Sequence, residues 1–326
     1  MRILAITTLR NEASFLLDWL AYHRCIGFTD FLIFTNHCDD GTAQMADRLQ
    51  TLGLAQHLPN PAPWPEGPQW AAMKQAEKHP LFAQADWVMV LDIDEYLCLH
   101  HGDGTLASLL GSYPEYDAFP MTWRLFGNNG VTALEDRPIP QIFTRCAPRV
   151  MHWPWRALMV KTLFRRASFA KLGVHRPHHP QGLPRWSDPD LGERIFSRPG
   201  RDPYGLGQVN HYALGAMESY ILKSDRGRAN RKASTADMAY WCARNFDTVE
   251  DLRLARFDYD AERTALFADP LLYGLHQTSM SWRRHRFAEL MREESNRSLY
   301  GNLLMTPSSR ILSAQEAASI RHFGLR

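Results

Sequence analysis

An apolar run that ends in three acidic residues is the part of this sequence with the clearest chemical content. Residues 88–91 have the composition of a buried parallel strand, and Asp92, Asp94 and Glu95 come directly after them. Side chains two apart on a strand point to the same side, so we expect Asp92 and Asp94 to converge just past the strand's carboxyl end. Open α/β sheets bind their ligands at that edge.

Two carboxylates that close together repel each other unless one is protonated or a cation lies between them. A hard divalent cation would relieve the repulsion and would leave coordination positions free for the phosphates of a nucleotide. The alternative is an acidic turn that caps the next helix. The buried strand before the acids and the aromatic Tyr96 after them favour the metal site.

The composition is typical of a protein with a substantial core. The chain has 326 residues, 45% of them hydrophobic, which is enough for one large domain or one and a half. Its formal net charge of +2 is too small to indicate nucleic-acid binding. The five cysteines are scattered without a C-x-x-C pair, which argues against a zinc site and favours a reducing compartment. Without a stretch that fits a signal peptide or a membrane span, we expect a cytoplasmic protein.

The first hundred residues alternate between strand-like and helix-like patterns. Such repeats indicate parallel strands joined by right-handed crossovers. No G-x-G-x-x-G follows the first strand, which argues against an ordinary dinucleotide-binding domain. The patterns predict strands at 3–8, 31–35 and 54–58, and helices at 11–25, 42–52 and 70–79.

The later part of the chain is less regular. Residues 175–203 form a loop that is longer than packed connections usually are. From about residue 240 the pattern is helical and strongly charged. We therefore predict an α/β domain over residues 1–235, with a mostly parallel sheet flanked by helices, and a helical C-terminal extension over residues 236–326. Further strands are expected at 118–123, 157–164 and 208–211, and a helix at 216–228.

Six short segments, taken in order, are similar to motifs of one enzyme group. They resemble the GT-A glycosyltransferases, and within them a family-2-like group close to the family 92 (DUF23) transferases. The resemblance covers residues 3 to about 232 and implies a Rossmann-like GT-A catalytic domain. The segments are TTLRNE (7–12) with DWLAYH (18–23), IGFTDF (26–31), DIDEY (92–96), WRLFGNNG (123–130), Lys161 with His175, and HY (211–212) followed by Lys223, Arg226 and Gly227.

The resemblance implies a nucleotide sugar as donor, with a UDP-sugar the first choice, and Mn²⁺ or Mg²⁺ as cofactor. Asp94 would be the strongest metal ligand, and Asp92 would bind the metal or the donor ribose. In related enzymes a histidine from the C-terminal half often completes the coordination. His211, at a predicted strand end, is the first candidate and His175 the second. An ordinary buried or surface histidine is the alternative for both.

Several polar residues are expected to bind the donor. Lys223 and Arg226 share one face of a predicted helix and could bind the diphosphate, although a solvated basic face is the alternative. In the loop 126–130, glycine permits tight turns while amides and asparagines could donate to sugar hydroxyls. The residues expected around the nucleoside or the donor sugar are Thr8, Arg10, Glu12, Asn36, Gln69, Asn128 and Asn129.

The base that accepts the proton of the acceptor hydroxyl is the remaining catalytic group. The resemblance implies inversion by direct displacement, so a carboxylate should lie opposite the leaving group. Asp188 in the long loop is the first candidate, and Glu135 or Asp136 is the alternative; each could also be an ordinary surface acid. Asp39 and Asp40 are expected to cap the following helix instead.

The sequence thus predicts a metal-dependent inverting glycosyltransferase with a glycan, lipid-linked or protein acceptor. One alternative is a carbohydrate- or nucleotide-binding protein that keeps the GT-A fold without turnover, and the intact Asp92 and Asp94 argue against it. The other is a metal-dependent nucleotidyltransferase. That class normally needs a glycine-rich basic loop after the first strand, which residues 8–12 do not supply.

A segment near the C-terminus could place the protein at a membrane. Residues 282–286 are mostly basic, and Phe287, Leu290 and Met291 follow at helical spacing. A basic amphipathic helix of this kind can lie on the inner face of an anionic membrane as a peripheral contact. Because Glu289 and later acids dilute the positive charge, we prefer a helix packed on the catalytic domain with its charged side in water.

Overall fold

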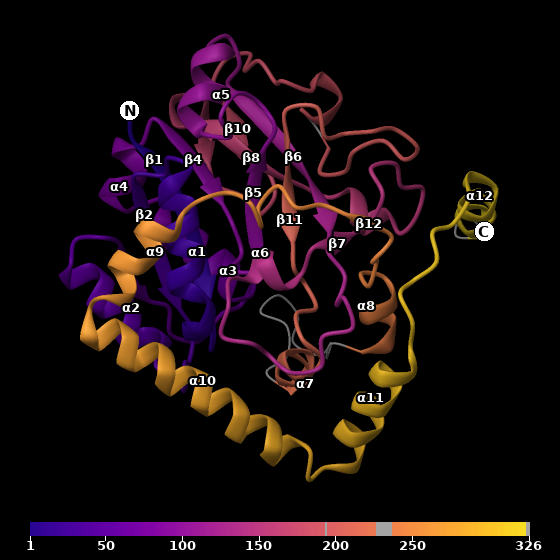
Figure 1. Ribbon diagram of the computed structural model, residues 1–326. Helices are drawn as coiled ribbons and strands as arrows, with labels where there is room; N and C mark the ends of the chain where they lie inside the picture. Colours follow the sequence, from indigo (N-terminus) through magenta and orange to yellow (C-terminus); the bar gives the residue numbers. More distant parts are fainter. Residues whose placement is uncertain (193, 226–236, 324–326) are drawn as a thin grey trace.

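The structure is a computed structural model that describes residues 1–192, 194–225 and 237–323. At its centre is an eight-stranded sheet in the order β3-β2-β1-β4-β8-β6-β11-β5, with helices packed around it (Figure 1). The strands of this sheet are β1 (Ile3–Leu9), β2 (Asp30–Thr35), β3 (Gln56–Pro59), β4 (Trp87–Val90), β5 (Glu95–Leu99), β6 (Ala118–Leu125), β8 (Val160–Arg165) and β11 (Gly207–His211).

Helices and short strands surround this sheet. The helices are α1 (Ala13–Cys25), α2 (Thr42–Thr51), α3 (Pro68–Ala76), α4 (Pro80–Gln84), α5 (Leu106–Ser112), α6 (Ile139–Ile142), α7 (Met217–Asp225), α8 (Met238–Cys242), α9 (Asp260–Phe267), α10 (Pro270–Leu290), α11 (Glu294–Met305) and α12 (Ala314–Phe323). Short strands are β7 (Arg145–Cys146), β9 (Phe169–Lys171), β10 (His178–Pro180) and β12 (Val249–Glu250), and three 3-10 turns cover Trp155–Leu158, Arg166–Ser168 and Pro189–Leu191.

Most of the central strands are parallel. β3, β2, β1 and β4 run in one direction, and β8 runs against both of its neighbours, β4 and β6. β11 is parallel to β6 and antiparallel to β5. The sheet confirms the predicted α/β class, a GT-A-type arrangement of mostly parallel strands flanked by helices. β5 was not expected from the sequence, because it begins directly at Glu95, at the end of the acidic run.

The side chains of β1 alternate between two cores. Ile3 and Ala5 belong to a large buried cluster with α1, whereas Leu4 and Ile6 belong to a second one with α3. A strand covered by helices on both faces needs this continuous apolar composition. The carboxyl end of β1 therefore lies between two helical layers, which fixes the place of the polar residues that follow it.

The C-terminal region is helical, as predicted. α10 runs beside α1, α2 and α7, at the lower edge of the molecule in Figure 1, and α11 follows next to α7. β12 pairs with β7 and so joins this region to the first part of the chain. The predicted boundary at residues 235–236 lies outside the described residues and remains a prediction.

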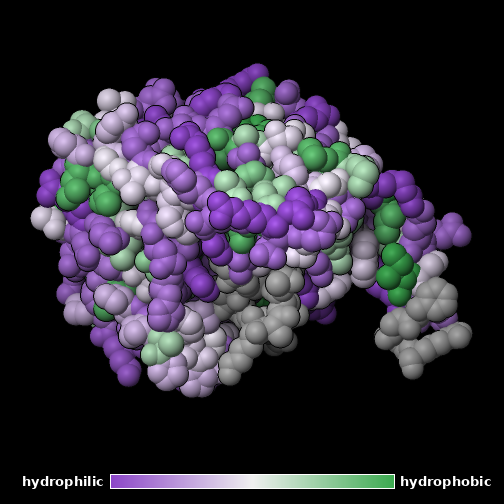
Figure 2. All heavy atoms as spheres, turned by 90° about the horizontal axis from the view of Figure 1, so that it is seen from below, coloured by the Kyte–Doolittle hydropathy of each residue, from purple (hydrophilic) through white to green (hydrophobic). Residues whose placement is uncertain are grey.

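The apolar side of the segment 282–291 packs against protein. Leu290 is buried and Phe287 half-buried in a cluster with Tyr300 and residues of α7. Arg284 and His285 are exposed, and the surface seen from below is mostly hydrophilic, with hydrophobic residues in small groups (Figure 2). This packing agrees with a helix that rests on the catalytic domain. Among the described residues, no helix is long and apolar enough to cross a membrane.

Candidate active site

Asp92 and Asp94 lie in the turn between β4 and β5. The strand ends at Val90, and the N–H of Glu95 closes the turn on the carbonyl of Asp92 at 3.0 Å. Strand alternation therefore does not extend through the two acids, and the expectation that both face one shared point remains a prediction. Each carboxylate is instead bound by its own lysine, 3.2 Å away at Asp92 and 2.8 Å away at Asp94.

The Asp92 carboxylate is held by a buried network. Its Oδ1 accepts a hydrogen bond from Gln69 Nε2 at 2.7 Å, and its Oδ2 accepts one from Lys161 Nζ at 3.2 Å. Lys161 also contacts Glu95 Oε2 at 3.0 Å, and the side chains of Lys161 and Glu95 are both 0% exposed. The ammonium thus bridges two carboxylates in a place where water cannot replace it.

Glu95 ties this network to the sheet. Its Oε1 accepts from Trp123 Nε1 at 2.8 Å, and its Oε2 accepts from the Asp92 N–H at 2.8 Å. Burial raises the pKa of Glu95, and the Lys161 ammonium opposes that shift. Burial alone would lower the pKa of Lys161, but the two carboxylates outweigh it and raise that pKa. Lys161 therefore stays charged, and it is a structural part of the site to which the sequence assigned no role.

The Asp94 carboxylate has a lysine partner that is more exposed than that of Asp92. Its Oδ2 accepts a hydrogen bond from Lys223 Nζ at 2.8 Å, and the same ammonium donates to the carbonyl of Ala213 at 2.7 Å. The side chains of Asp94 and Lys223 are 24% and 20% exposed. Lys223 comes from α7, so the predicted diphosphate-binding lysine and the predicted metal ligand do lie together.

His211 stands next to Asp94 at the end of β11. Its Nε2 is 3.8 Å from Asp94 Oδ2, which is too long for a hydrogen bond, and its ring packs on Trp123. Burial lowers the pKa of His211 to about 3, so the imidazole is neutral near pH 7. Its buried Nδ1 has no hydrogen-bond partner among the described residues. His211 therefore has an uncharged ring beside a carboxylate, and its expected role as a metal ligand remains a prediction.

His175 belongs to the Asp92 side. Its Nδ1 donates to the carbonyl of Val160 at 3.0 Å, and its ring contacts Trp123. Burial lowers the pKa of His175 to about 4, with a further contribution from the nearby Lys161. Both candidate histidines thus contact the ring of Trp123.

A divalent cation fits the Asp94 side. A carboxylate oxygen and a neutral imidazole are both suitable ligands for Mn²⁺. Among the described residues, no group of three or more His, Cys, Asp or Glu side chains could hold a metal ion by itself. A cation here would need further ligands from a substrate, which is how Mg²⁺ commonly binds with nucleotide phosphates.

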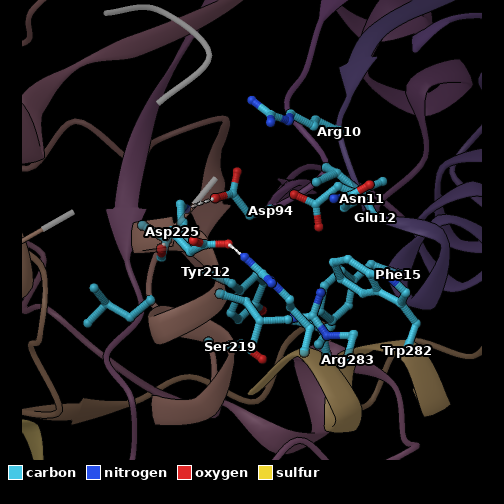
Figure 3. Close-up of a pocket in the computed structure, with 18 of the residues that line it drawn as sticks. Arg10, Asn11, Glu12, Phe15, Asp94, Tyr212, Ser219, Asp225, Trp282 and Arg283 are labelled. Carbon is cyan, nitrogen blue, oxygen red and sulfur yellow. Dashed lines mark hydrogen bonds and ion pairs between the residues drawn. The ribbon is translucent and has the colours of Figure 1, made fainter. Parts of the chain in front are cut away.

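Asp94 and Lys223 line a cavity of about 560 Å³. One wall is formed by residues 10–15, at the β1–α1 junction, and another by α7 and α10. In Figure 3, Arg10 and Asp94 lie at one end of the cavity, while Ser219, Trp282 and Arg283 lie at the other. Its volume falls in the range of small-molecule sites.

The wall next to β1 is fixed by Asp40. The Asp40 Oδ1 accepts the N–H of Thr42, the first residue of α2, at 3.0 Å, although Gly41 and not an aspartate is the N-cap. The Asp40 Oδ2 accepts the N–H of Ala13 at 3.1 Å, so the same carboxylate also holds the beginning of α1. Asn11 has a positive φ of 57°, and its Oδ1 accepts the N–H of Asp39 at 2.7 Å. These bonds turn the chain so that residues 10–12 border the cavity.

The predicted donor-binding residues fall into groups. Arg10, Glu12 and Lys223 line the cavity, and Gln69 contacts Asp92. Thr8 is half-buried at the end of β1, on the face that α3 covers. Asn36 is buried and accepts a hydrogen bond from Asn60 Nδ2 at 2.6 Å. Arg226 lies outside the described residues.

Asn128 and Asn129 use their side chains within the protein. Asn128 Nδ2 donates to the carbonyls of Val131 and Gly215, both at 2.8 Å. The Asn129 Oδ1 accepts the N–H of Arg145 at 2.8 Å. Neither residue lines the cavity. Their amides hold the loop 126–130 in shape, which leaves them no evident donor for a sugar hydroxyl.

The three candidate bases lie away from this cavity. Asp188 caps a 3-10 turn by accepting the N–H of Asp190 at 3.0 Å. Glu135 is paired with Arg137, and Asp136 accepts from His276 Nε2 at 2.7 Å. None of them lines the cavity. Local sequence pattern cannot locate a base, since its position depends on which loops fold toward the substrate.

The cavity wall from α10 was not predicted. The sequence singled out the segment 282–291 for its charge, but it gave no sign that Trp282 and Arg283 face α1. Arg283 lies over the ring of Phe15, with its guanidinium carbon 4.6 Å from the ring centroid. This contact joins residues far apart in the chain.

Comparison with known proteins gives one family. The model of glycosyltransferase family 92 matches residues 3–185, which include Asp92, Asp94 and Lys161. A family 92 protein of Ricinus communis is 28% identical over 156 residues, or 43% of this chain and 25% of that protein. One of Oryza sativa subsp. japonica is 29% identical over 145 residues, or 42% of this chain and 24% of that protein. The chain thus spans about a quarter of the length of these curated relatives.

Solved structures give looser matches. The crystal structure of S. aureus TarS 1-349 in complex with UDP-GlcNAc has a TM-score of 0.35 and 13% identity, and the match covers 93% of this chain and 79% of that one. The expected position within a family-2-like group remains a prediction.

Proposed function

Because the chain belongs to glycosyltransferase family 92, we propose that it transfers a sugar from a nucleotide-sugar donor, with a UDP-sugar the first choice, to a glycan, lipid-linked or protein acceptor. The observation that carries this proposal is that Asp94 and Lys223 line a cavity just past the end of a central strand, with the buried His211 next to Asp94. A carboxylate, an imidazole and an ammonium are the groups that a metal-bound diphosphate needs.

The leaving group explains why these residues belong together. As the glycosidic bond breaks, negative charge develops on the nucleoside diphosphate and must be stabilised. Asp94 and His211 would hold Mn²⁺ or Mg²⁺, which would neutralise part of that charge. The Lys223 ammonium, partly exposed in the cavity, can donate charge-assisted hydrogen bonds to the same phosphates.

Asp92 would orient the donor without carrying the metal. Lys161 and Gln69 each occupy one of its oxygens, so its carboxylate is fixed in direction. It is 29% exposed and can still accept a hydrogen bond from a ribose hydroxyl. Arg10, at the end of β1, would lie near the nucleoside.

We assign inversion by direct displacement to this site, and its base to a carboxylate of the cavity. Apart from Asp94, the most buried acid that lines it is Glu12, at 6% exposed. A general base contributes about 10²–10⁴-fold to a rate, so Glu12→Gln should lower kcat by about 10²-fold or more with donor affinity kept. A larger loss of kcat in Asp188→Asn than in Glu12→Gln would instead support the loop residue.

The proposed compartment is the cytoplasm. The structure describes all five cysteines of the chain, and each of them is free. Free and partly buried thiols are typical of a reducing environment.

A donor screen tests the proposal. Thermal shift with UDP-, GDP-, dTDP- and CMP-sugars, each with Mn²⁺ and with Mg²⁺, should show stabilisation by one nucleotide class. The stabilising donors are then assayed for release of the nucleoside diphosphate. Binding without release would indicate a non-catalytic binding protein, and pyrophosphate release from a nucleoside triphosphate and a sugar 1-phosphate would indicate a nucleotidyltransferase. Stabilisation by none of the donors would refute the proposal.

A further inference from the structure

One wall of the cavity is built by helices that the family model does not cover. The model ends at residue 185, whereas this wall comes from α7 and α10. Besides Leu222 and Lys223, it includes Ser219, Asp225, Trp282, Arg283, Arg286 and Glu289. A wall beyond the matched region can carry a property of this chain that the family match does not describe.

The wall presents aromatic surface to the cavity. Trp282 is half-buried in α10 and lines the cavity, and half-buried Phe15 of α1 lines it as well. Figure 3 shows both near the end of the cavity that is remote from Asp94 and Arg10. Flat aromatic faces pack well on the apolar C–H face of a sugar ring, while the sugar hydroxyls remain free for hydrogen bonds.

Neighbouring contacts hold this wall in place. Arg283 is 8% exposed and packs over Phe15, which joins α10 to α1. Arg286 donates to Asp225 of α7 at 2.9 Å and to Glu289 at 3.1 Å. α10 is therefore held against both α1 and α7, so a ligand would meet a preformed surface.

The charges along the cavity are nearly balanced. Its basic residues are Arg10, Lys223, Arg283 and Arg286, and its acidic residues are Glu12, Asp39, Asp94, Asp225 and Glu289. On the α7–α10 wall, Arg286 is already paired with two acids. A wall whose charges are paired fits a neutral polar ligand better than a strongly anionic one such as a lipid headgroup.

Ser219 supplies a second observation that points to a ligand. Its side chain is 9% exposed and lines the cavity. Its hydroxyl has no hydrogen-bond partner among the described residues. A buried hydroxyl without a partner costs free energy, so a ligand that offers one is favoured there.

We propose that the α7–α10 wall is an acceptor subsite for a neutral saccharide, with Trp282 as the platform for a sugar ring. The paired groups of Arg286, Glu289 and Asp225, together with Ser219, would bind the hydroxyls. This inference rests on the proposed function, because it assumes that the bound sugar receives the transferred group at the Asp94 end of the cavity. It narrows the acceptor to one with a neutral saccharide next to the acceptor hydroxyl.

Calorimetric titration tests the subsite separately from the donor site. Lactose, maltose and cellobiose serve as probes, each titrated into the full chain saturated with UDP and Mn²⁺. Trp282→Ala should weaken binding of the best probe at least about tenfold and leave UDP binding unchanged. Trp155→Ala is the matched control, because Trp155 is 45% exposed and does not line the cavity, and it should change neither affinity.

Two further variants separate a binding role from a folding role. Trp282→Phe keeps a flat ring and should retain most of the probe affinity, and Ser219→Ala should lower it several-fold without a change in the unfolding midpoint. Equal probe affinity in Trp282→Ala and the wild type would overturn the subsite, as would the absence of probe binding to the wild type. A wild type that binds the probes but no nucleotide sugar would overturn the proposed function and leave the saccharide site standing.

Discussion

Asp92 and Asp94 are two residues apart, and each is paired with a lysine, but their surroundings differ. Lys161, the partner of Asp92, is 0% exposed and also contacts the fully buried Glu95. Lys223, the partner of Asp94, is 20% exposed and borders the cavity. Asp92 therefore has a structural role through its buried lysine, whereas Asp94 can exchange its lysine partner for a ligand.

The energetic reason lies in access to water. Removing one partner of a buried ion pair leaves an uncompensated charge and costs about 3–5 kcal/mol. A partly exposed pair contributes about 0–1 kcal/mol, because water replaces the lost partner. Substitutions at the two lysines should therefore separate stability from ligand binding.

The largest change in stability is expected for Lys161→Met. Loss of the ammonium leaves Glu95 and Asp92 without their cation, so the free energy of unfolding should fall by about 3–5 kcal/mol in urea denaturation. Lys161→Met combined with Glu95→Gln should recover part of that loss. Lys74→Met is the control, since Lys74 and its partner Glu66 are both 60% exposed, and it should change stability by less than about 0.5 kcal/mol. If Lys161→Met lowers the free energy of unfolding by less than about 1 kcal/mol, Asp92 and Lys161 do not have this structural role, because an exposed ion pair contributes about 0–1 kcal/mol.

The largest change in turnover is expected for Asp94→Asn. Removing one group that stabilises charge in the transition state costs about 10²–10³-fold in kcat, and this carboxylate would also lose its metal. The unfolding free energy should change by less than about 1 kcal/mol, since the side chain is partly exposed. Donor hydrolysis and urea denaturation on the same preparation check both parts. Turnover within a factor of about three of the wild type would show that Asp94 has no catalytic role, because that loss is far smaller than the one expected for such a group.

Lys223→Ala should act mainly on donor affinity. Charge-assisted hydrogen bonds contribute about 1–3 kcal/mol, so UDP should bind about five- to 150-fold more weakly in calorimetric titration. The control is Lys171→Ala, since Lys171 is exposed and does not line the cavity. Equal UDP affinity in the wild type and Lys223→Ala would show that this lysine only pairs with Asp94 and does not bind the donor.

The smallest expected effect is on the pH dependence of the free energy of unfolding, and it comes from His211. Burial lowers the pKa of His211 to about 3 from its usual 6.5, so below pH 6.5 the unfolded chain takes up a proton that the folded chain excludes. Stability should fall as the pH drops from 6.5 toward 3, and at about pH 5 His211 alone should account for about 1–2 kcal/mol of that fall. His211→Asn should flatten this slope, whereas His285→Asn, on the exposed side of α10, should not. An unchanged slope in His211→Asn would show that the imidazole is not held neutral.

The parts of the site that local pattern determines were predictable. The apolar run before Asp92 indicated a central strand, and the acids at 39–40 indicated that a helix follows them, as α2 does. The different lysine partners of Asp92 and Asp94 were not predictable, because tertiary packing brings each lysine to its carboxylate. Lys161 meets Asp92 across 69 residues of chain, a pairing that the topology of β8 brings about.

The remaining misses have the same origin. Asn128 and Asn129 looked like ligand-binding groups, but their amides hold their own loop. Trp282 reaches the cavity because α10 packs on α1 and α7. Contacts of this kind depend on tertiary packing, which periodicity and spacing do not encode.

The most direct test of the account is UDP titration with and without Mn²⁺ in the wild type, Asp94→Asn and Asp92→Asn. In the wild type, Mn²⁺ should strengthen UDP binding. We predict that Asp94→Asn loses this gain, whereas Asp92→Asn binds UDP more weakly but keeps it, because each oxygen of Asp92 already accepts a hydrogen bond, from Gln69 or Lys161. The opposite result would contradict the roles assigned to the two carboxylates: Mn²⁺ would no longer strengthen UDP binding in Asp92→Asn but would still do so in Asp94→Asn.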